Sequence, residues 1–320
     1  MQRYLRKLNI VWESRIQYKM EKDEIESYVK AGEIAKQVKV FAKDLIEPGM
    51  KLIDIAEAVD AKIKELGGEP AFPVNLSLNE IAAHFTPAKN DETIAEGILK
   101  VDIGVAVGGF IADTAFSVDL TENKIFKEMI ELNEKVLEDV TAVIKPDMEV
   151  REVGDVAQDT LKKWNEDNGS RFAMIKSLSG HELGQDRIHA GLTISNYRND
   201  NKTKLDDIAF AIEPFVTSGV GDIYEGGPGG IYVLNSDVGV RDRDAREVLK
   251  FIKEKYKTRP FCLRWLEKEN FGKLKFVISI LVKQGVLHEY PLLIEKSKAP
   301  VSQAENTFVL VDGVVRVTTC

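Results

Sequence analysis

Residues 101–118 read Val-Asp-Ile-Gly-Val-Ala-Val-Gly-Gly-Phe-Ile-Ala-Asp-Thr-Ala-Phe-Ser-Val, two strand-like runs on either side of Gly108-Gly109. A two-residue Gly-Gly loop between such runs predicts an antiparallel hairpin. If these glycines form the turn, Asp102 and Asp113 share one face of the sheet as diagonal neighbours, about 7–8 Å apart at the backbone. Two bare carboxylates would repel each other there, so we expect cations between them.

The other side chains of this hairpin separate into two sets. The face of the aspartates is otherwise small or polar: Gly104, Ala106, Ala115 and Ser117. The opposite face is apolar: Val101, Ile103, Val105, Val107, Phe110, Ala112, Phe116 and Val118. We expect the apolar face to pack on the core and the other face to hold hard ligands.

The composition fits a globular protein. The 320 residues are 44% hydrophobic and 30% charged, and the net charge of -8 argues against nucleic acid as the main ligand. The only two cysteines, Cys262 and Cys320, cannot build a disulfide framework or a cysteine zinc site. No apolar run approaches the roughly 18 residues of a membrane span, and the N-terminus lacks an apolar signal segment. We therefore expect a cytoplasmic protein with no membrane association.

Two helix pairs along the chain have related patterns. Apolar periodicity predicts helices over residues 25–45 and 53–66, separated by a turn at Pro48-Gly49. A shift of 98 residues places Pro48 on Pro146 and aligns the flanking apolar positions. A duplication explains this match, although any two helix–turn–helix pairs can align in this way. We predict an α+β domain of two pseudo-symmetric halves, with helices outside a curved antiparallel sheet.

The segment 233–292 differs in character. Helical patterns over residues 244–257 and 276–284, followed by a strand over 286–290, predict a winged-helix-like insert. Residues 241–275 contain 12 basic and 6 acidic side chains, a net charge of +6, so the remainder carries -14. We therefore divide the chain into an N-terminal extension, a main domain and an insert: 1–20, 21–232 with 293–320, and 233–292.

The chain has four histidines. His181 and His189 lie in one glycine-rich segment that begins like a zinc-protease HExxH motif but has Gln185 where the second histidine belongs. In extended structure their even spacing would let both point to one side. His84, between small apolar residues and a turn signal, is a candidate acid–base group, and His288 in the insert receives no role. A lone histidine is more often a solvated or capped residue than a ligand.

Two glutamates interrupt apolar strand-like runs, Glu213 in residues 208–216 and Glu305 in residues 304–311. A structural ion pair would explain each of them, because an unpaired buried charge is costly. No basic residue lies within six positions of Glu213, however. Two aspartates, two glutamates and a histidine are hard ligands suited to two divalent ions about 3.5–4 Å apart.

The segments VDIGVAVGGFIADTA, GHELGQDRIHAG, AIEPF and AENT, in this order, resemble the methionine aminopeptidases of the pita-bread fold. The resemblance extends over about residues 21–320. The long interval between Glu213 and Glu305, with the insert inside it, resembles the type II class of archaea and eukaryotes. The segments AFPVNLSLNEIAAHFTP and EYPLL also resemble type II.

The resemblance implies a ligand set for two divalent ions (Co, Mn, Fe or Zn): Asp102, Asp113, His181, Glu213 and Glu305. It implies that Asp102 binds one ion through both oxygens, that Asp113 and Glu305 bridge, and that His181 and Glu213 complete the second site. Glu213 is also implied as the general base. The resemblance further assigns His189 to the scissile carbonyl and His84 to the scissile amide or the leaving nitrogen.

The same resemblance implies a pocket for the methionine side chain, lined by Phe72, Ile188, Phe215 and Tyr290. Three positions depart from the family pattern. Ala304 and Asn306 stand where an aromatic residue and a histidine are usual, and Ser195 replaces a usual proline. None of the three is an implied ligand or catalytic residue, so the departures bear on activity level and pocket shape.

The implied function is removal of the initiator methionine from nascent proteins whose second residue is small, by a monomer. Three alternatives remain. A prolidase-like Xaa-Pro dipeptidase would use the same ligands, although the insert argues against it. A ribosome- or RNA-associated module of this fold would have lost its activity, and a winged-helix nucleic-acid binder would use the basic insert. Charges such as Lys250, Lys253 and Lys257 could dock the enzyme on the ribosome.

Overall fold

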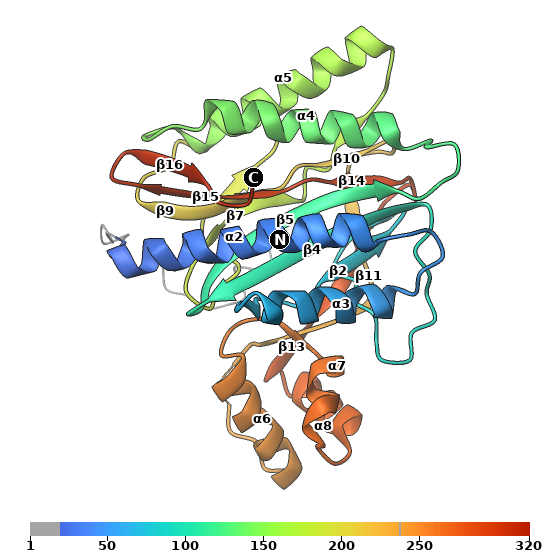
Figure 1. Cartoon of the computed structure of the whole chain (residues 1–320), viewed down its shortest axis with the longest axis vertical. Helices are drawn as coiled ribbons and strands as arrows, with labels where there is room; N and C mark the ends of the chain where they lie inside the picture. The colour runs from blue at the N-terminus through green and yellow to red at the C-terminus, as the bar shows by residue number, and fades with distance from the viewer. Residues whose placement is uncertain (1–19, 237) are drawn as a thin grey trace.

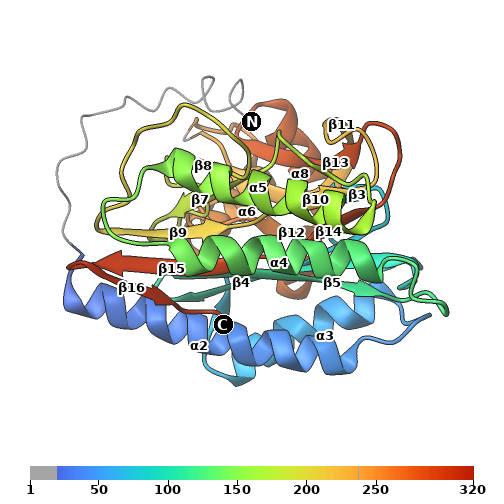
Figure 2. The same ribbon diagram turned by 90° about the horizontal axis from the view of Figure 1, so that it is seen from above.

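The computed structural model describes residues 20–236 and 238–320. Almost all of the predicted N-terminal extension therefore lies outside the described residues. Figures 1 and 2 show two pairs of helices, α2 (Lys22–Leu45) with α3 (Leu52–Glu65) and α4 (Lys127–Val143) with α5 (Val150–Asn168), which lie along different parts of the sheets. The helices of the insert project as a separate group at one end (Figure 1). Among the described residues, no helix combines the length and apolar character needed to cross a membrane.

The first helix pair, α2 (Lys22–Leu45) and α3 (Leu52–Glu65), confirms the predicted helices. Helix α2 begins slightly earlier than predicted because Glu21 and Glu24 form a reciprocal capping box, which satisfies backbone donors at the helix start. The apolar sides of both helices bury against the apolar face of the hairpin and form the core of the first half.

The second helix pair, α4 (Lys127–Val143) and α5 (Val150–Asn168), repeats the first. Helices α3 and α5 begin 98 residues apart, the shift that the sequence predicts. The connections also match: Gly49 and Asp147 both adopt positive φ, 85° and 61°. The residue before each second helix bridges a later segment, Lys51 with Ile94 and Glu149 with Lys204. The two pseudo-symmetric halves of the predicted α+β fold are present.

The first half contains the predicted hairpin in a sheet of four strands: β1 (Glu69–Pro70), β2 (Asn75–Leu78), β4 (Ile98–Val107) and β5 (Phe110–Asp119). The predicted register is confirmed, with Asp113 opposite Gly104 and Asp102 opposite Ala115. Gly108 in the turn has a φ of 60°, a conformation that favours glycine. The register therefore places both aspartates on one face.

The second half contributes most of a five-stranded sheet, ordered β16-β15-β9-β7-β8. Its strands are β7 (Ser179–Leu183), β8 (Thr193–Ser195), β9 (Ile208–Ile212), β15 (Asn306–Val311) and β16 (Val314–Val317). A smaller sheet, ordered β14-β10-β6, contains β6 (Ala173–Met174), β10 (Phe215–Thr217) and β14 (Val301–Gln303). Helices α4 and α5 cover this half and share its hydrophobic core.

Both glutamates lie at strand breaks, so the prediction of continuous strands over residues 208–216 and 304–311 is wrong at these points. Glu213 separates β9 from β10, and Glu305 separates β14 from β15. The two breaks face each other, because Ile212 pairs with Asn306 on one side and Phe215 pairs with Gln303 on the other. The chain leaves one sheet for the other here, which frees both glutamates from the regular strand pattern.

The insert has its own hydrophobic core, to which helices α6 and α8 and the short elements β12 and α7 contribute. Its elements are α6 (Arg243–Lys255), β12 (Phe261–Cys262), α7 (Leu263–Leu266), a 3₁₀ turn (Glu267–Glu269) and α8 (Leu274–Lys283). The long strands β11 (Ile223–Leu234) and β13 (Leu287–Glu295) run through both predicted boundaries. They pair with each other, and β13 also pairs with β3 (Ile81–Ala83) of the main domain. The insert is therefore anchored through a shared sheet.

Candidate metal centre

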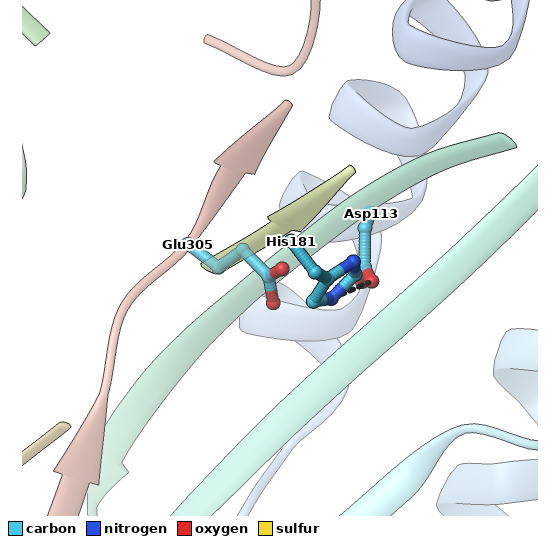
Figure 3. Close-up of side chains that lie close together, drawn as sticks. All are labelled: Asp113, His181 and Glu305. Atoms are coloured by element: carbon cyan, nitrogen blue, oxygen red, sulfur yellow. Dashed lines mark ion pairs between the residues drawn. The ribbon is translucent and has the colours of Figure 1, made fainter. Parts of the chain in front are cut away.

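The structure brings the predicted ligands together from both halves. Figure 3 shows Asp113, His181 and Glu305 pointing toward one another, and one ligand atom from each lies within 4.8 Å of the others. His181 Nε2 lies 3.8 Å from Asp113 Oδ2 and 3.7 Å from Glu213 Oε1. Asp102 lies on the same face as Asp113 and lines the same pocket.

Close backbone packing positions two of these side chains. A Cβ atom on Gly104, opposite Asp113, would lie 2.2 Å from the Phe72 ring, so only glycine admits that ring beside the aspartates. A Cβ atom on Gly180 would lie 2.3 Å from the Ala211 carbonyl oxygen. The strand of His181 can therefore lie tightly against β9.

Strand contacts also tie the first-half hairpin to the break at Glu305. Ala115 and Glu305 form an isolated antiparallel bridge. The Thr114 hydroxyl donates a hydrogen bond to the Glu305 carbonyl oxygen at 2.9 Å. Glu305 is thus held against the strand that carries Asp113.

Burial and mutual repulsion in this cluster disfavour the ionised form of the carboxylates when no cation lies beside them. Burial raises the pKa of Asp102 to about 6, although a hydrogen bond from Gln303 opposes the shift. Burial also raises the pKa of Asp113 well above its usual range, and the charges of Glu305 and Asp102 add to this. The pKa values of Glu213 and Glu305 are raised in the same way, by burial first and by neighbouring carboxylates second.

The donor set fits divalent cations. Four buried carboxylate oxygens of the cluster have no hydrogen-bond partner among the described residues: Asp102 Oδ1, Asp113 Oδ1, Glu305 Oε1 and Glu305 Oε2. Within the described chain, none of the four carboxylates forms an ion pair with lysine or arginine. Buried charges of this kind need partners, and hard oxygen ligands with one imidazole suit Mn, Fe, Co or Zn.

His189 approaches His181 in a way that the sequence did not predict. The segment is not extended, because Gly184 and Arg187 close a tight turn after β7. The chain then returns along β7, with Ala190 donating a backbone hydrogen bond to Glu182. The ring centroids of His181 and His189 lie 4.5 Å apart. The proximity therefore comes from a reversal of the chain and not from even strand spacing.

His84 lines the same pocket as Asp102 and Asp113. It directly follows β3 and has a φ of 70°, which is unusual for a residue other than glycine. Its backbone N–H donates to Asn75 Oδ1 at 2.9 Å, and its Nδ1 lies 3.2 Å from the Pro291 carbonyl oxygen. Its ring centroid is 5.1 Å from that of Tyr290. These contacts hold the imidazole in one orientation.

The metal-free surroundings keep the imidazoles neutral. The pKa of His84 is lowered to about 4, mainly by burial and also by the neighbouring His189, while the Pro291 carbonyl opposes the shift. Loss of solvent also lowers the pKa of His189. The His189 side chain also keeps an exposed surface.

A single pocket joins these groups. The four predicted apolar wall residues and the predicted polar residues other than Glu305 line it: Phe72, His84, Asp102, Asp113, His181, Ile188, His189, Glu213, Phe215 and Tyr290. Sequence reasoning missed further lining residues: Asn75, Ala83, Leu178, Ser179, Ile231, Pro260 and Leu293. Glu305 is buried behind the pocket surface.

Sequence reasoning also missed amides that support the ligands. Gln303 Nε2 lies 3.4 Å from Asp102 Oδ2. Asn196 Nδ2 donates to the Glu213 carbonyl oxygen at 2.9 Å. Gln303 stands two positions before Glu305, and strand alternation could have pointed to it. Nothing in the sequence around Asn196 signals its contact, which depends on the fold.

The three departures from the family pattern lie at or beside the site. Ala304 is buried in the core of the second half. The Asn306 side chain points toward the C-terminal residues, where its Nδ2 donates to Cys320 Sγ at 3.0 Å and its Oδ1 accepts from Thr319. Ser195 ends β8, directly before Asn196.

The model of one protein family, described as metallopeptidase family M24, matches residues 26–248. The chain belongs to this metallopeptidase family. It is 44% identical over 297 residues to a methionine aminopeptidase of Thermococcus kodakarensis, with 90% of this chain and 97% of that protein covered. It is 41% identical over 301 residues to a methionine aminopeptidase of Pyrococcus horikoshii, with 92% and 99% covered.

A solved structure of a thermophilic Arx1 has the same fold, with a TM-score of 0.77 and 17% identity over 93% of this chain and 91% of that one. This likeness bears on the fold alone. Together the comparisons confirm the resemblance to methionine aminopeptidases that the motifs indicate, and the predicted pita-bread fold.

Proposed function

We propose that this chain is a dinuclear metal-dependent aminopeptidase that removes the initiator methionine from proteins whose second residue is small, as a monomer in the cytoplasm. One observation carries the proposal: four buried or half-buried carboxylates and a histidine converge at an apolar pocket, and among the described residues none of the carboxylates forms an ion pair with lysine or arginine. The names of the relatives at 41–44% identity support the same activity.

Five residues would hold the ions. Asp102 would bind one ion, His181 and Glu213 the other, and Asp113 with Glu305 both. Bound divalent ions lower the pKa of water to near neutrality and polarise a carbonyl oxygen. Glu213, which lies at the pocket, would accept the proton of the attacking water.

The two remaining histidines would act on the peptide bond from the pocket walls. A neutral imidazole carries one N–H, so His189 can donate to the scissile carbonyl oxygen. His84 directs Nδ1 at a backbone carbonyl oxygen, so its single N–H lies there and its Nε2 lone pair would accept a hydrogen bond from the N–H of the scissile amide or of the leaving nitrogen.

The pocket walls support selection of methionine. Phe72, Ile188, Phe215 and Tyr290 offer apolar and aromatic surface, to which a flexible thioether side chain binds well. Three of the carboxylates, Asp102, Asp113 and Glu213, line the same pocket, where they and the ions would hold a free α-amine. A chain with a blocked N-terminus would lack that amine, so the site favours exopeptidase action.

Specificity tests this proposal directly. The metal-reconstituted protein should cleave Met-Ala-Ser and Met-Gly-Ser far faster than Met-Leu-Ser, and Ala-Pro poorly or not at all. A preference for Ala-Pro over all methionine peptides would instead identify an Xaa-Pro peptidase of the same family. Failure to cleave any peptide while both ions are bound would favour a binding module.

A second proposal concerns the ribosome. The net charge of +6 over residues 241–275 supports docking on ribosomal RNA near emerging chains. Arg243, Lys250 and Lys255 are exposed on α6 and suit a charge-reversal test. Lys257 does not suit it, because its Nζ pairs with Asp186 of the main domain at 2.6 Å.

Replacement of Arg243, Lys250 and Lys255 by glutamate should weaken salt-sensitive co-sedimentation with purified ribosomes and leave Met-Ala-Ser hydrolysis unchanged. Reversal of Lys30, Lys162 and Lys163, three exposed lysines of α2 and α5, is the matched control. Equal co-sedimentation of both triple variants and the unaltered protein would leave the insert without a docking role.

A further inference from the structure

Residues 257–264, which follow α6 and run into the start of α7, lie where the insert meets the main domain. It contains three basic residues that contact the main domain: Lys257, Arg259 and Arg264. The same stretch contributes Pro260 to the wall of the catalytic pocket. Its charged contacts lead to two separate loops, each of which carries a pocket histidine.

The first contact reaches the loop of His189. Asp186 is only 7% exposed and lies between two cations of the insert. Lys257 Nζ is 2.6 Å from Asp186 Oδ2, and Arg259 Nε is 3.2 Å from Asp186 Oδ1. The Thr258 hydroxyl also donates to the Asp186 carbonyl oxygen. His189 follows Asp186 by three residues on the same turn.

The hairpin tip fixes this loop from the other side. The backbone N–H of Asp186 donates to the Gly109 carbonyl oxygen at 2.7 Å, and Gln185 Nε2 donates to the Gly108 carbonyl oxygen at 2.9 Å. A Cβ atom on Gly109 would lie 2.8 Å from the Asp186 carboxylate. The loop is therefore held between the hairpin and the insert, so its position depends on both.

The second contact reaches the segment after His84. Arg264 is 2% exposed, and its Nη1 donates to the Pro87 carbonyl oxygen at 2.9 Å. Its Nη2 donates to Asp60 Oδ2 of α3 at 2.9 Å, and the indole N–H of Trp265 donates to the same oxygen. Pro87 follows His84 by three residues. Buried charges that lose a partner are costly, so these bonds favour one arrangement of the segment.

Neither group of contacts includes a predicted metal ligand, and neither uses the exposed basic face of α6. A docking module would not need buried ion pairs at the bases of two pocket loops. We propose that residues 257–264 act as a clamp in which Arg259 with Lys257 positions His189 through Asp186, and Arg264 positions His84 through Pro87. The insert thereby sets the placement of both imidazoles across the pocket. The catalytic value of that placement rests on the proposed function.

Two variants and two matched controls test the clamp. Asp186→Asn removes the charge that both insert cations contact, and Glu69→Gln removes the other ion pair of Arg259, at 2.7 Å, without touching the histidine loop. Arg264→Lys removes the fork that reaches Pro87. Lys268→Gln removes a neighbouring ion pair with Glu57 that does not touch the loop of His84.

The first readout needs no turnover. The chain has four histidines, so imidazole signals in ¹H–¹⁵N spectra can be assigned from single substitutions. Asp186→Asn should move the His189 signal and spare that of His84, and Arg264→Lys should do the reverse. The two controls should move neither. The spectra test the clamp without any need for aminopeptidase activity. Failure of the clamp can therefore be distinguished from failure of the proposed function.

The second readout is kinetic. With metal content unchanged, each clamp variant should lower kcat on Met-Ala-Ser by about 10- to 100-fold with a smaller change in KM, because misplacement of a catalytic group by about 1 Å has effects of that size. The controls should keep kcat close to that of the unaltered protein. If these contacts had a merely structural role, the clamp variants would have a lower melting temperature but would not show a larger change in kcat than in KM.

Milder variants cover the case in which a buried substitution prevents folding. Lys257→Met removes the half-exposed partner of Asp186 but keeps Arg259. Glu57→Gln weakens Arg264 from the exposed side, at its 2.9 Å contact with Nε. Lys257→Met should give a smaller shift of the His189 signal, and Glu57→Gln should give a smaller shift of the His84 signal. Unmoved imidazole signals in every folded variant, or equal shifts in the controls, would overturn the clamp.

Discussion

Thr307 and Asp113 exchange two hydrogen bonds across the junction between the halves. The Asp113 backbone N–H donates to Thr307 Oγ1, and that hydroxyl donates to the Asp113 carbonyl oxygen, both at 2.7 Å. Both residues are buried. Thr307, which follows Glu305 by two residues in the second half, thus fixes the backbone of Asp113, a predicted ligand in the first half.

Replacement of that threonine should therefore destabilise the fold. Thr307→Val keeps the shape but leaves the N–H and C=O of Asp113 without partners, which should lower the free energy of unfolding by about 1–3 kcal/mol per buried group. Urea denaturation measures this. Thr141→Val is the control, because the buried Thr141 hydroxyl has no partner among the described residues, and its loss should be close to neutral. Equal effects of the two changes would contradict the role of the junction.

Loss of one shared carboxylate charge should abolish activity. Asp113→Asn removes charge from the centre of the cluster, so we expect no Met-Ala-Ser hydrolysis and fewer than two ions per chain by elemental analysis. Asp119→Asn is the matched control, because Asp119 is a buried aspartate of the same strand whose carboxylate accepts from Thr121 and Phe126. Two bound ions and full activity in Asp113→Asn would refute the dinuclear site.

Removal of the His189 imidazole should separate chemistry from metal binding. His189→Ala should lower kcat by about 10²–10⁴-fold, as for a positioned proton-transfer or hydrogen-bonding group, with the ion count unchanged. His288→Ala in the insert should leave kcat close to that of the unaltered protein. Loss of an ion in His189→Ala would instead make His189 a ligand, and its role would have to be exchanged with that of His181.

The stability of the metal-free protein should fall as the pH rises above neutrality. The pKa of Asp102 is raised to about 6, and those of Asp113, Glu213 and Glu305 are raised further from their usual values. Above about pH 4 the unfolded chain has lost protons that the folded cluster still binds, so stability declines until the raised pKa values are passed. His84 and His189, whose pKa values are lowered to about 4, act in the opposite direction below about pH 6.5. The melting temperature of the metal-free protein should therefore fall between about pH 7 and pH 8, where these histidines are neutral in both states.

Added Mn or Co should reverse this trend, because ligands bind metal in the deprotonated form and ion binding releases the protons. The rise in melting temperature on metal addition should be largest near pH 8, with protons released into a weakly buffered solution. The metal-loaded protein is the control for all other ionisable groups. A metal-free protein whose stability rises over this range would contradict the raised carboxyl pKa values.

Local chemistry explains which features were predictable. The Gly108-Gly109 turn fixes the register of the hairpin, and that register alone places Asp102 and Asp113 on one face. The duplicated helix pairs are visible in the sequence because Pro48 and Pro146 mark equivalent turns. These features depend on residues near each other along the chain.

Long-range features were not predictable in the same way. The contact between Asp186 and Arg259 joins residues 73 positions apart and leaves no local pattern. The return of the chain at Gly184 was missed because glycine permits both extended and turned structure. The strand break at Glu213 depends on pairing with a segment near Glu305, so it too required the fold.

The central claim is that the buried carboxylate cluster binds two divalent ions and uses them to remove N-terminal methionine. The most direct measurement titrates Mn, Co, Fe or Zn, one at a time, into the metal-free protein while bound ions and Met-Ala-Ser hydrolysis are followed together. The account predicts no hydrolysis without metal, saturation at two ions per chain, and release of free methionine that rises with occupancy. Hydrolysis by the metal-free protein, or two bound ions with no release of methionine under any of the four metals, would contradict it.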